Sequence, residues 1–257
     1  MPRPARVPDS PFWVEPESVD DAGSRLFLSP EESHHLLRVF RAAPGTSFEA
    51  IDGAGTLYRC VLERADEGKA VGRIESRETD ARELPASIAL LVGLPEFGQA
   101  EAVVEHAVPL GATSIDFVAA VRSGREAFSP VRLERLERLS RSALKQSRRT
   151  RKPALRSSGT LAEALAATGA ATARFVADPE GDMALSLPAS EKAGAQLSVA
   201  LAVGPPGGFL QEETGLLHAS GYHPISLGPS RLTTSTATIA LLSLARKLLL
   251  TSRLPRS

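Results

Sequence analysis

Three glycines and two prolines directly follow an apolar run, in a loop whose backbone could bind a ligand. The run Leu197–Val203 is short and apolar enough to be a strand buried on both faces of a parallel sheet. The loop Gly204–Phe209 follows it, and Leu210–Thr214 resembles the first turn of a helix. The glycines of this loop permit positive φ and allow main-chain N–H and C=O groups to come close to a ligand. Open α/β sheets bind ligands at this end of their strands. The alternative is a plain tight turn between a strand and a helix.

A second loop of the same kind comes about twenty residues later. Alternating strands and helices produce this spacing. It spans Ser226–Thr238, overlaps the end of a short strand, His223–Leu227, and leads into an apolar helix, Ile239–Leu250. Two such loops at strand ends favour a binding site over a pair of turns.

Together the two loops resemble the cofactor-binding loops of the SPOUT methyltransferases, most closely the family that methylates N3 of a uridine in 16S ribosomal RNA. That family carries a Gly-Pro-Glu-Gly-Gly-Phe loop and then a Leu-Gly-x-x-x-Leu-Arg-x-Glu-Thr-Ala loop. The matching residues are Gly204, Pro205, Gly207, Gly208, Phe209, Leu227, Gly228, Leu232, Thr234, Thr236 and Ala237. Three positions depart from the pattern: Pro206 and Ser235 replace Glu, and Thr233 replaces Arg.

The resemblance implies that S-adenosylmethionine is the cofactor and that both loops, with a third strand end, hold it through main-chain groups. The cofactor-binding residues implied are Leu94, Val203, Gly204, Pro205, Gly207, Gly208, Leu227, Gly228, Leu232, Thr233, Ser235, Thr236 and Ala237. Methyl transfer from a sulfonium is an in-line displacement, in which holding donor and acceptor close and aligned supplies much of the rate. It requires no metal.

Uridine N3 is a weak nucleophile until its proton leaves, so a base or a cation that stabilises the anion would help. Two arginines are candidates for this catalytic role. Arg231 lies in the second loop, and Arg149 matches a Gln-Ser-x-Arg motif of the family that is followed by a proline. The sequence does not choose between them.

Positive charge is concentrated in residues 122–156. Thirty basic and thirty acidic residues cancel over the whole chain, yet this segment has twelve Lys or Arg against three Glu. Such a segment is typical of phosphate-backbone binding. The alternative, a solvated helix face with Glu–Arg pairs, fits the first half but not Lys145–Lys152, which has no acidic residue. The predicted RNA-binding residues here are Lys145, Gln146, Arg148, Arg149, Arg151 and Lys152.

The first eighty residues predict a small β-barrel. Ser29–Glu32 reads as a helix N-terminus with a capping box, and the helix runs to about Phe40. Three alternating runs and their turn sequences follow, at Thr46–Ile51, Leu57–Leu62 and Ala70–Ile74. The order of these features resembles the PUA-like RNA-binding domain that precedes the catalytic domain in the same family.

Four residues near that helix invite a functional reading. Arg38 and Arg41, spaced i and i+3, would share a helix face and contact RNA phosphate, or only solvent. His34 and His35 have no other His, Cys or acidic cluster at ligand spacing, which favours a structural or RNA-contacting role over a metal site.

From residue 81 onward, apolar strands alternate with helices, which predicts a parallel sheet covered on both faces. The charged stretch 76–85 reads as a linker, which separates a PUA-like domain at 1–80 from a SPOUT domain at 81–257. The longest helix, Ser129–Ser147, carries a leucine stripe on one side. The resemblance alone implies a C-terminal trefoil knot and a homodimer that builds the site at its interface.

Composition and the remaining motifs bound the function. A single cysteine, Cys60, fits a reducing compartment, and no run is apolar and long enough to span a bilayer, so we expect a cytoplasmic protein that uses no membrane and no metal. The resemblance makes 16S ribosomal RNA in the small ribosomal subunit the expected partner. Two alternatives remain: an RNA-binding homologue that has lost cofactor binding and catalysis, and an α/β enzyme using Gly204–Gly208 as a phosphate cradle, although Glu212 and Glu213 would repel phosphate.

Overall fold

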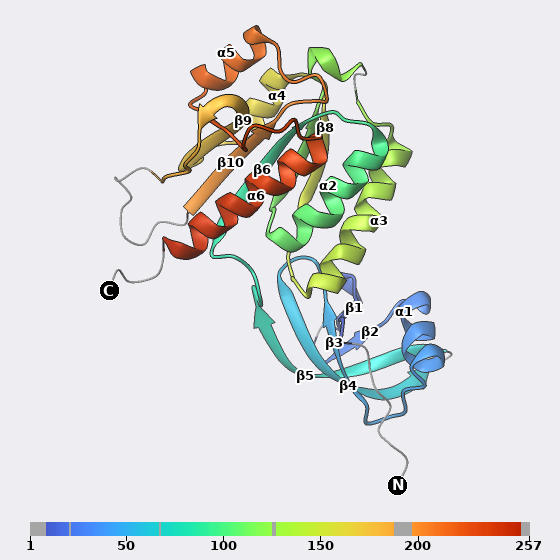
Figure 1. The fold of residues 1–257 in the computed structure, drawn as a ribbon. Coiled ribbons are helices and arrows are strands. Elements are labelled where there is room, and N and C mark those ends of the chain that lie inside the picture. The colour runs from blue at the N-terminus through green and yellow to red at the C-terminus, as the bar shows by residue number, and fades with distance from the viewer. Residues whose placement is uncertain (1–8, 21, 67, 125–126, 188–196, 253–257) are drawn as a thin grey trace. The chain divides into compact units, whose positions relative to one another are not determined.

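The structure, a computed structural model, describes residues 9–20, 22–66, 68–124, 127–187 and 197–252. Its contacts divide the chain into two compact units. The first unit comprises residues 1–83 together with 141–152, and the second comprises 84–140 and 153–257. Figure 1 shows the elements of both.

The first unit contains a mixed five-stranded sheet that forms a half-barrel (Figure 1). Its strands are β1 (Phe12–Trp13), β2 (Arg25–Phe27), β3 (Ser47–Ile51), β4 (Thr56–Asp66) and β5 (Lys69–Thr79). They lie in the order β1-β3-β4-β5-β2, and β1 pairs with β3 in parallel while the other pairs are antiparallel. A 3-10 turn at Pro16–Ser18 follows β1. The predicted β-structure is confirmed in this form.

The core of the first unit consists of side chains that alternate along these strands. Phe12 and Phe48 are almost fully buried, and their rings meet edge to face at 5.7 Å. A Cβ added at Gly72 would lie 2.6 Å from the Phe48 ring, so the glycine leaves room for that ring. Burial of apolar side chains such as these is the main driving force for folding.

The helix of this unit is short and changes its form. Helix α1 (Pro30–His34) is capped by the Ser29 hydroxyl, which accepts from the Glu32 N–H at 3.2 Å, and it continues as a π-helical turn, η2 (His35–Val39). The predicted capping box is incomplete, because the Glu32 carboxylate pairs with Lys145. Arg41 lies beyond the last helical residue with φ +53°, so the predicted helix face shared with Arg38 is wrong.

The predicted linker at 76–85 is partly wrong. Strand β5 continues to Thr79 and pairs with β4 as far as Thr56. Arg77 and Glu78 of this stretch lie on an exposed strand surface, where Arg59 and Glu78 form an ion pair at 2.8 Å. Charge alone therefore does not mark a linker here, since the exposed side of a long hairpin is polar as well.

The second unit contains a six-stranded, all-parallel sheet, as predicted. Its strands are β6 (Ala86–Gly93), β7 (Ser114–Val118), β8 (Ala154–Ser158), β9 (Ala173–Asp182), β10 (Leu197–Val203) and β11 (His223–Ile225). They lie in the order β11-β9-β10-β6-β7-β8. The central strand β10 is buried on both faces, which explains its continuous apolar sequence. Strand β8 was not predicted, because its sequence is half polar and it forms the edge of the sheet.

Helices cover both faces of this sheet (Figure 1). They are α2 (Phe97–Leu110), α3 (Pro130–Ser147), α4 (Leu161–Ala167), α5 (Gln211–Ala219) and α6 (Thr234–Thr251), with a 3-10 turn η3 (Val121–Ser123) after β7. Helices α2 and α6 pack against each other on one face, and α4 and α5 on the other. The apolar face of α4 and α5 reaches the sheet through Leu161, Ala164 and Leu217. The last turns of α3, from Arg141, group with the first unit.

Candidate ligand-binding site

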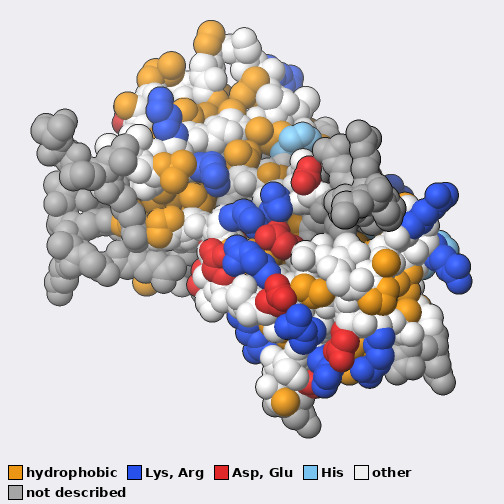
Figure 2. All heavy atoms as spheres, turned by 90° about the horizontal axis from the view of Figure 1, so that it is seen from below, with side chains coloured by type: hydrophobic (Ala, Val, Ile, Leu, Met, Phe, Trp, Pro, Cys, Tyr) orange, Lys and Arg blue, Asp and Glu red, His pale blue; other side chains and the backbone are white. Residues whose placement is uncertain are grey.

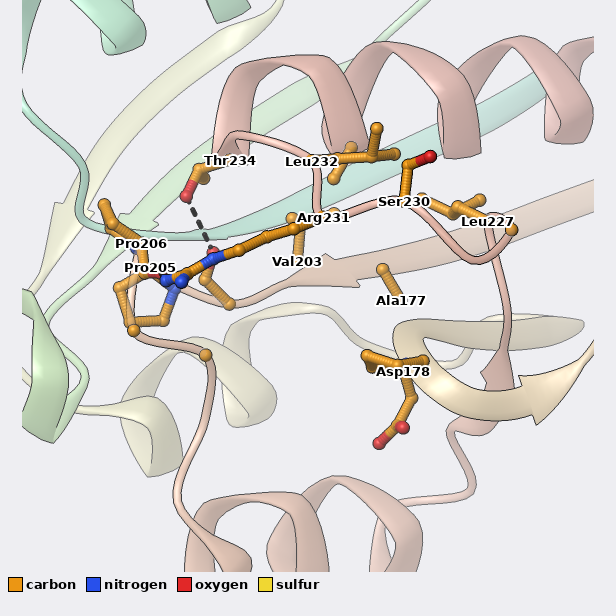
Figure 3. A pocket seen from close by; sticks show the side chains of 16 residues that line it. Ala177, Asp178, Val203, Pro205, Pro206, Leu227, Ser230, Arg231, Leu232 and Thr234 are labelled. Carbon is orange, nitrogen blue, oxygen red and sulfur yellow. Dashed lines mark hydrogen bonds between the residues drawn. The ribbon is translucent and has the colours of Figure 1, made fainter.

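A pocket lies at the carboxyl ends of β9 and β10 in the second unit, where the sequence predicts a ligand site. It has a volume of about 360 Å³, a size typical of small-molecule sites. Its lining residues are Ala177, Asp178, Pro179, Val203, Gly204, Pro205, Pro206, Gly207, Gly208, Leu227, Gly228, Ser230, Arg231, Leu232, Thr234 and Ala237. Figure 3 shows both glycine-containing loops at this pocket.

The first loop, residues 204–209, is compact and closely packed. The Gly208 N–H donates to the Pro205 carbonyl at 2.7 Å, and Gly208 adopts φ +72°, which favours glycine. A Cβ added at Gly93, at the end of β6, would lie 2.3 Å from the Pro205 nitrogen. The loop therefore presents backbone to the pocket and packs backbone against the neighbouring strand.

The second loop is fixed to the first by a side chain. Thr234, at the start of α6, is buried, and its hydroxyl donates to the Gly204 carbonyl at 3.1 Å (Figure 3). Thr233 caps α6, since its hydroxyl accepts from the Thr236 N–H at 3.2 Å. Gly228 has φ +102°, which lets the chain turn between β11 and α6.

Two charged side chains line the pocket. Arg231 reaches across from the second loop, and its guanidinium donates to the Pro206 carbonyl at 3.3 Å (Figure 3). Asp178 comes from β9, and its carboxylate accepts from the Glu180 N–H at 2.9 Å. The sequence analysis missed Asp178, whose only signal in the sequence is that it directly follows the short apolar run Phe175–Ala177. Within the described residues, the lining is otherwise main chain, proline and apolar or hydroxyl side chains.

Four of the predicted cofactor-binding residues do not line the pocket. Leu94 is fully buried, and its N–H donates to the Val118 carbonyl at 2.8 Å. Thr233, Ser235 and Thr236 form a cluster of hydroxyls at the start of α6, with the Thr233 oxygen 3.1 Å from that of Ser235 and 2.9 Å from that of Thr236. The cluster organises the helix N-terminus next to Thr234, which does line the pocket.

Comparison with known families decides the assignment of the family. A family model described as RNA methyltransferase domain matches residues 82–246, and one described as RNA methyltransferase PUA domain matches 28–75. The chain belongs to this RNA methyltransferase family. The predicted recognition of the family is therefore confirmed.

Relatives within the RNA methyltransferase family match most of the chain. Two that are named ribosomal RNA small subunit methyltransferase E come from Synechocystis and Mycobacterium bovis. The first is 30% identical and the alignment covers 89% of this chain and 74% of the relative. The second is 31% identical and covers 94% and 92%.

Solved structures of similar proteins share the fold. A probable rRNA-methyltransferase from Porphyromonas gingivalis is 26% identical, has a TM-score of 0.79 and covers 95% of this chain and 100% of its own. A Legionella pneumophila protein described as a methyltransferase in complex with the bound cofactor SAM is also 26% identical, with a TM-score of 0.74, and covers 94% and 98%.

Arg149, the other predicted catalytic residue, is buried in the first unit of this methyltransferase. Its guanidinium donates to the Glu83 carboxylate through Nε at 3.0 Å and Nη2 at 2.7 Å, and both side chains are less than a tenth exposed. The second carboxylate oxygen of Glu83 accepts from the backbone N–H groups of Thr150 and Arg151 at 2.7 and 2.8 Å. Arg149 thus fixes the segment after α3 to the residues that follow β5.

The basic run Lys145–Lys152 contains no acidic residue, but it has acidic partners elsewhere in the chain that the sequence analysis did not anticipate. The partners lie far away in the sequence: Lys145 pairs with Glu32, Arg148 with Glu49 at 3.0 Å, and Arg151 with Asp80. A scan of neighbouring positions could not find them, because the first unit supplies all of these acids through its fold. Figure 2 likewise shows Lys and Arg side chains interspersed with Asp and Glu on one face.

The remaining predicted RNA-binding residues differ in their exposure. Arg38, Arg41 and Gln146 are exposed, and Lys152 is half-buried. Arg125, which is part of the basic segment, lies outside the described residues.

In the described part of the chain, no helix is long and apolar enough to cross a membrane, and no group of three or more His, Cys, Asp or Glu is placed to hold a metal.

Proposed function

We propose that this chain is an S-adenosylmethionine-dependent methyltransferase that methylates N3 of a uridine in the 16S ribosomal RNA of the small ribosomal subunit. The observation that carries the proposal is the pocket formed by the two glycine-containing loops in a chain of the RNA methyltransferase family. The relatives named small subunit methyltransferase E support the substrate, and the Legionella structure with bound SAM supports the cofactor.

The residues of the pocket fit S-adenosylmethionine. Apolar side chains such as Val203 and Leu232 provide surfaces for an aromatic base, and the backbone of residues 204–208 supplies polar groups. Asp178 supplies a carboxylate that can accept from hydroxyl or ammonium groups. When bound, the cofactor supplies a methyl group on a positively charged sulfur. Of the expected cofactor-binding residues, Leu94, Thr233, Ser235 and Thr236 would then act by shaping the loops.

Arg231 is the better candidate for the catalytic cation. It is exposed, it lines the pocket, and contact with Pro206 holds its guanidinium at the loop that binds the cofactor. A fixed cation there would stabilise the negative charge that develops on the uridine ring when N3 loses its proton. Arg149 is engaged with Glu83 in the other unit, so we assign it a structural role.

Two of the three departures from the family pattern, at positions 206 and 233, leave the loop contacts intact. The carbonyls of the first loop accept from Thr234, Arg231 and Arg122, so no glutamate at position 206 is needed to fix it. Thr233 caps α6 in place of an arginine. An RNA-binding homologue without catalysis remains the alternative, because the charged residues are absent.

The family resemblance adds further proposals on architecture and partners. We infer a PUA-like domain near residues 1–80 that binds RNA through Arg38 and Arg41, and a SPOUT domain from about 81 to 257 with a C-terminal trefoil knot. Two copies would assemble as a homodimer with the sites at its interface. The enzyme would act in the cytoplasm, where small ribosomal subunits are assembled.

Titration calorimetry of the purified protein with S-adenosylmethionine and S-adenosylhomocysteine tests the cofactor. Methylation of small subunits that lack the modification, followed by mapping of the modified base, then tests the substrate. We expect micromolar binding and one N3-methyluridine per subunit. An absence of binding by folded protein would favour the non-catalytic homologue. Arg231→Met should lower the methylation rate by about 10²-fold or more and change cofactor affinity much less, as expected for an electrostatic contact in the transition state.

A further inference from the structure

The turn η3, which follows β7, contacts the first loop of the pocket, residues 204–209, which is called the cofactor loop below. Neither of the two loop motifs found in the sequence includes this turn. Arg122 of this turn donates from Nη1 to the Gly207 carbonyl at 2.7 Å. Its side-chain carbons also lie over Gly207, because a Cβ added there would be 3.1 Å from Arg122 Cβ and Cδ. The arginine therefore contacts the loop with both its stem and its guanidinium.

A buried carboxylate fixes the position of the same turn. Glu213, at the start of α5, is 8% exposed, and its Oε1 accepts from the Val121 N–H at 2.9 Å. Its Oε2 accepts from the Leu210 N–H at 2.8 Å, directly after the cofactor loop. The turn that carries Arg122 is thus tied to the exit of the loop, and the arginine is held over Gly207.

The contact with Arg122 determines the direction of one peptide group. In a trans peptide the C=O and N–H point in opposite directions. The Gly207 carbonyl points to Arg122, and the N–H of the same peptide, at Gly208, points into the loop and donates to the Pro205 carbonyl at 2.7 Å. Glycine at 207 and 208 would permit other orientations of this peptide at little cost.

The neighbouring peptide is fixed in the same way on its carbonyl side. Arg231 donates to the Pro206 carbonyl, so the Gly207 N–H points away from that arginine. The prolines at 205 and 206 have no N–H. Within the described residues, the Gly207 N–H has no hydrogen-bond partner, although Gly207 lines the pocket. It is therefore a donor that the loop retains for a ligand.

We propose that Arg122 is a positioning residue for the cofactor loop: it fixes the Gly207–Gly208 peptide and, together with the contact of Arg231 on the preceding peptide, holds Gly207 so that its N–H remains available to S-adenosylmethionine. This inference rests on the proposed function. Arg122 itself does not line the pocket, so it acts through the loop and not by touching the cofactor. The hydrogen bond of a charged guanidinium to a carbonyl is among the stronger neutral-acceptor contacts in proteins.

Titration calorimetry with S-adenosylmethionine and S-adenosylhomocysteine on three variants tests the inference. Arg122→Met keeps the stem and removes the donor, Arg122→Lys keeps a donor, and Arg138→Met removes an exposed arginine of α3 as the matched control. We expect Arg122→Met to weaken both ligands about tenfold, Arg122→Lys to recover part of the loss, and Arg138→Met to bind like the wild type. The melting temperature without ligand should be the same for all three.

Binding by Arg122→Met within twofold of the wild type would overturn the inference and leave the proposed function standing. A drop in its ligand-free melting temperature as large as the loss of binding would also overturn it, because that shows a general structural role. If the wild type itself binds neither ligand, the proposed function fails and the inference fails with it. As a second measurement, Gly207→Ala should weaken binding less in the Arg122→Ala background than alone. The methyl group added at position 207 would displace the arginine stem, and Arg122→Ala removes that stem beyond Cβ.

Discussion

The hydroxyl of Thr234 donates to the carbonyl of Gly204 at 3.1 Å, and this bond joins the two loops of the pocket. Thr234 is 3% exposed, so water does not replace the bond when it is lost. We expect Thr234→Val, which keeps the shape, to weaken S-adenosylmethionine about fivefold and to lower the free energy of unfolding by about 1–2 kcal/mol. Calorimetry and urea unfolding measure the two effects.

Thr251, at the exposed end of the same helix, provides the control for this prediction. Its hydroxyl donates only to carbonyls of its own helix. Thr251→Val should leave cofactor affinity unchanged. Equal affinities for wild type and Thr234→Val would show that the pocket does not depend on the link between its loops.

The conformation of Gly208 predicts a graded response to substitution. Its φ of +72° strains any L-residue, whereas a Cβ there would meet no atom within 4 Å, so the cost is purely conformational. Gly208→Asn should retain more cofactor affinity than Gly208→Ala, and Gly208→Val should lose it, because Asn tolerates this region and β-branched residues do not. Calorimetry of the three variants gives the order directly.

Gly215, which lies inside α5, is the matched control for Gly208. A Cβ there also meets no atom within 4 Å, and no positive φ is required. Gly215→Ala should therefore stabilise the protein by up to about 1 kcal/mol through helix propensity and leave cofactor binding unchanged. A loss of cofactor binding in this variant equal to that of Gly208→Ala would point to a general effect of added side chains.

The sequence predicts the pocket well because its determinants are local. An apolar strand, a loop of glycines and a helix start follow each other directly at 197–214, and nine of the thirteen cofactor-binding residues named from the sequence line the cavity. The glycines mark positions where the backbone needs positive φ or close approach, and these needs can be recognised from the sequence alone. Asp178 was missed because one carboxylate after a strand has no local pattern.

The predictions for the basic run were poorer because its partners are distant in sequence. Each partner of Lys145, Arg148 and Arg151 lies more than sixty residues earlier, and only the folded first unit brings them together. Arg41 was misplaced for a related reason, since the helix ends in a π-helical turn that no periodicity indicates. Long-range ion pairs and helix ends depend on tertiary contacts that local patterns do not encode.

The Glu83–Arg149 pair should be a stability determinant and not a catalytic one. Both side chains are less than a tenth exposed, and removal of one partner leaves a buried charge that has lost its main counter-ion. We expect Glu83→Gln to lower the free energy of unfolding by about 3–5 kcal/mol, measured by urea denaturation. In protein that remains folded, cofactor affinity should stay within twofold of the wild type. A normal stability with a strongly reduced methylation rate would restore the catalytic role for Arg149.

Cys60 should be unreactive in the folded protein. Burial raises the pKa of its thiol from 9.0 to about 12, so the thiolate is scarce at neutral pH. At pH 8, a thiol reagent should label Cys60 orders of magnitude more slowly than in denaturant. Between pH 9 and 12 the folded thiol keeps a proton that the unfolded one releases, so this group makes the protein less stable as the pH rises through that range. Rapid labelling of folded protein at pH 8 would show that the β-sheet core is open at this position.

Arg38 and Arg41 should contribute to RNA affinity through phosphate contacts, and Lys145 should contribute little. The two arginines are exposed, whereas Lys145 is paired with Glu32 and would have to give up that partner to bind RNA. Each lost phosphate contact lowers the slope of log affinity against log salt by about 0.7 for single-stranded nucleic acid. Filter binding of a 16S ribosomal RNA fragment over a series of salt concentrations should therefore give a reduced slope for Arg38→Ala and Arg41→Ala and an unchanged slope for Lys145→Met. The reverse pattern would place the RNA on the basic run Lys145–Lys152 at the end of α3, as its charge alone suggests, and would mean that the acidic partners exchange for phosphate.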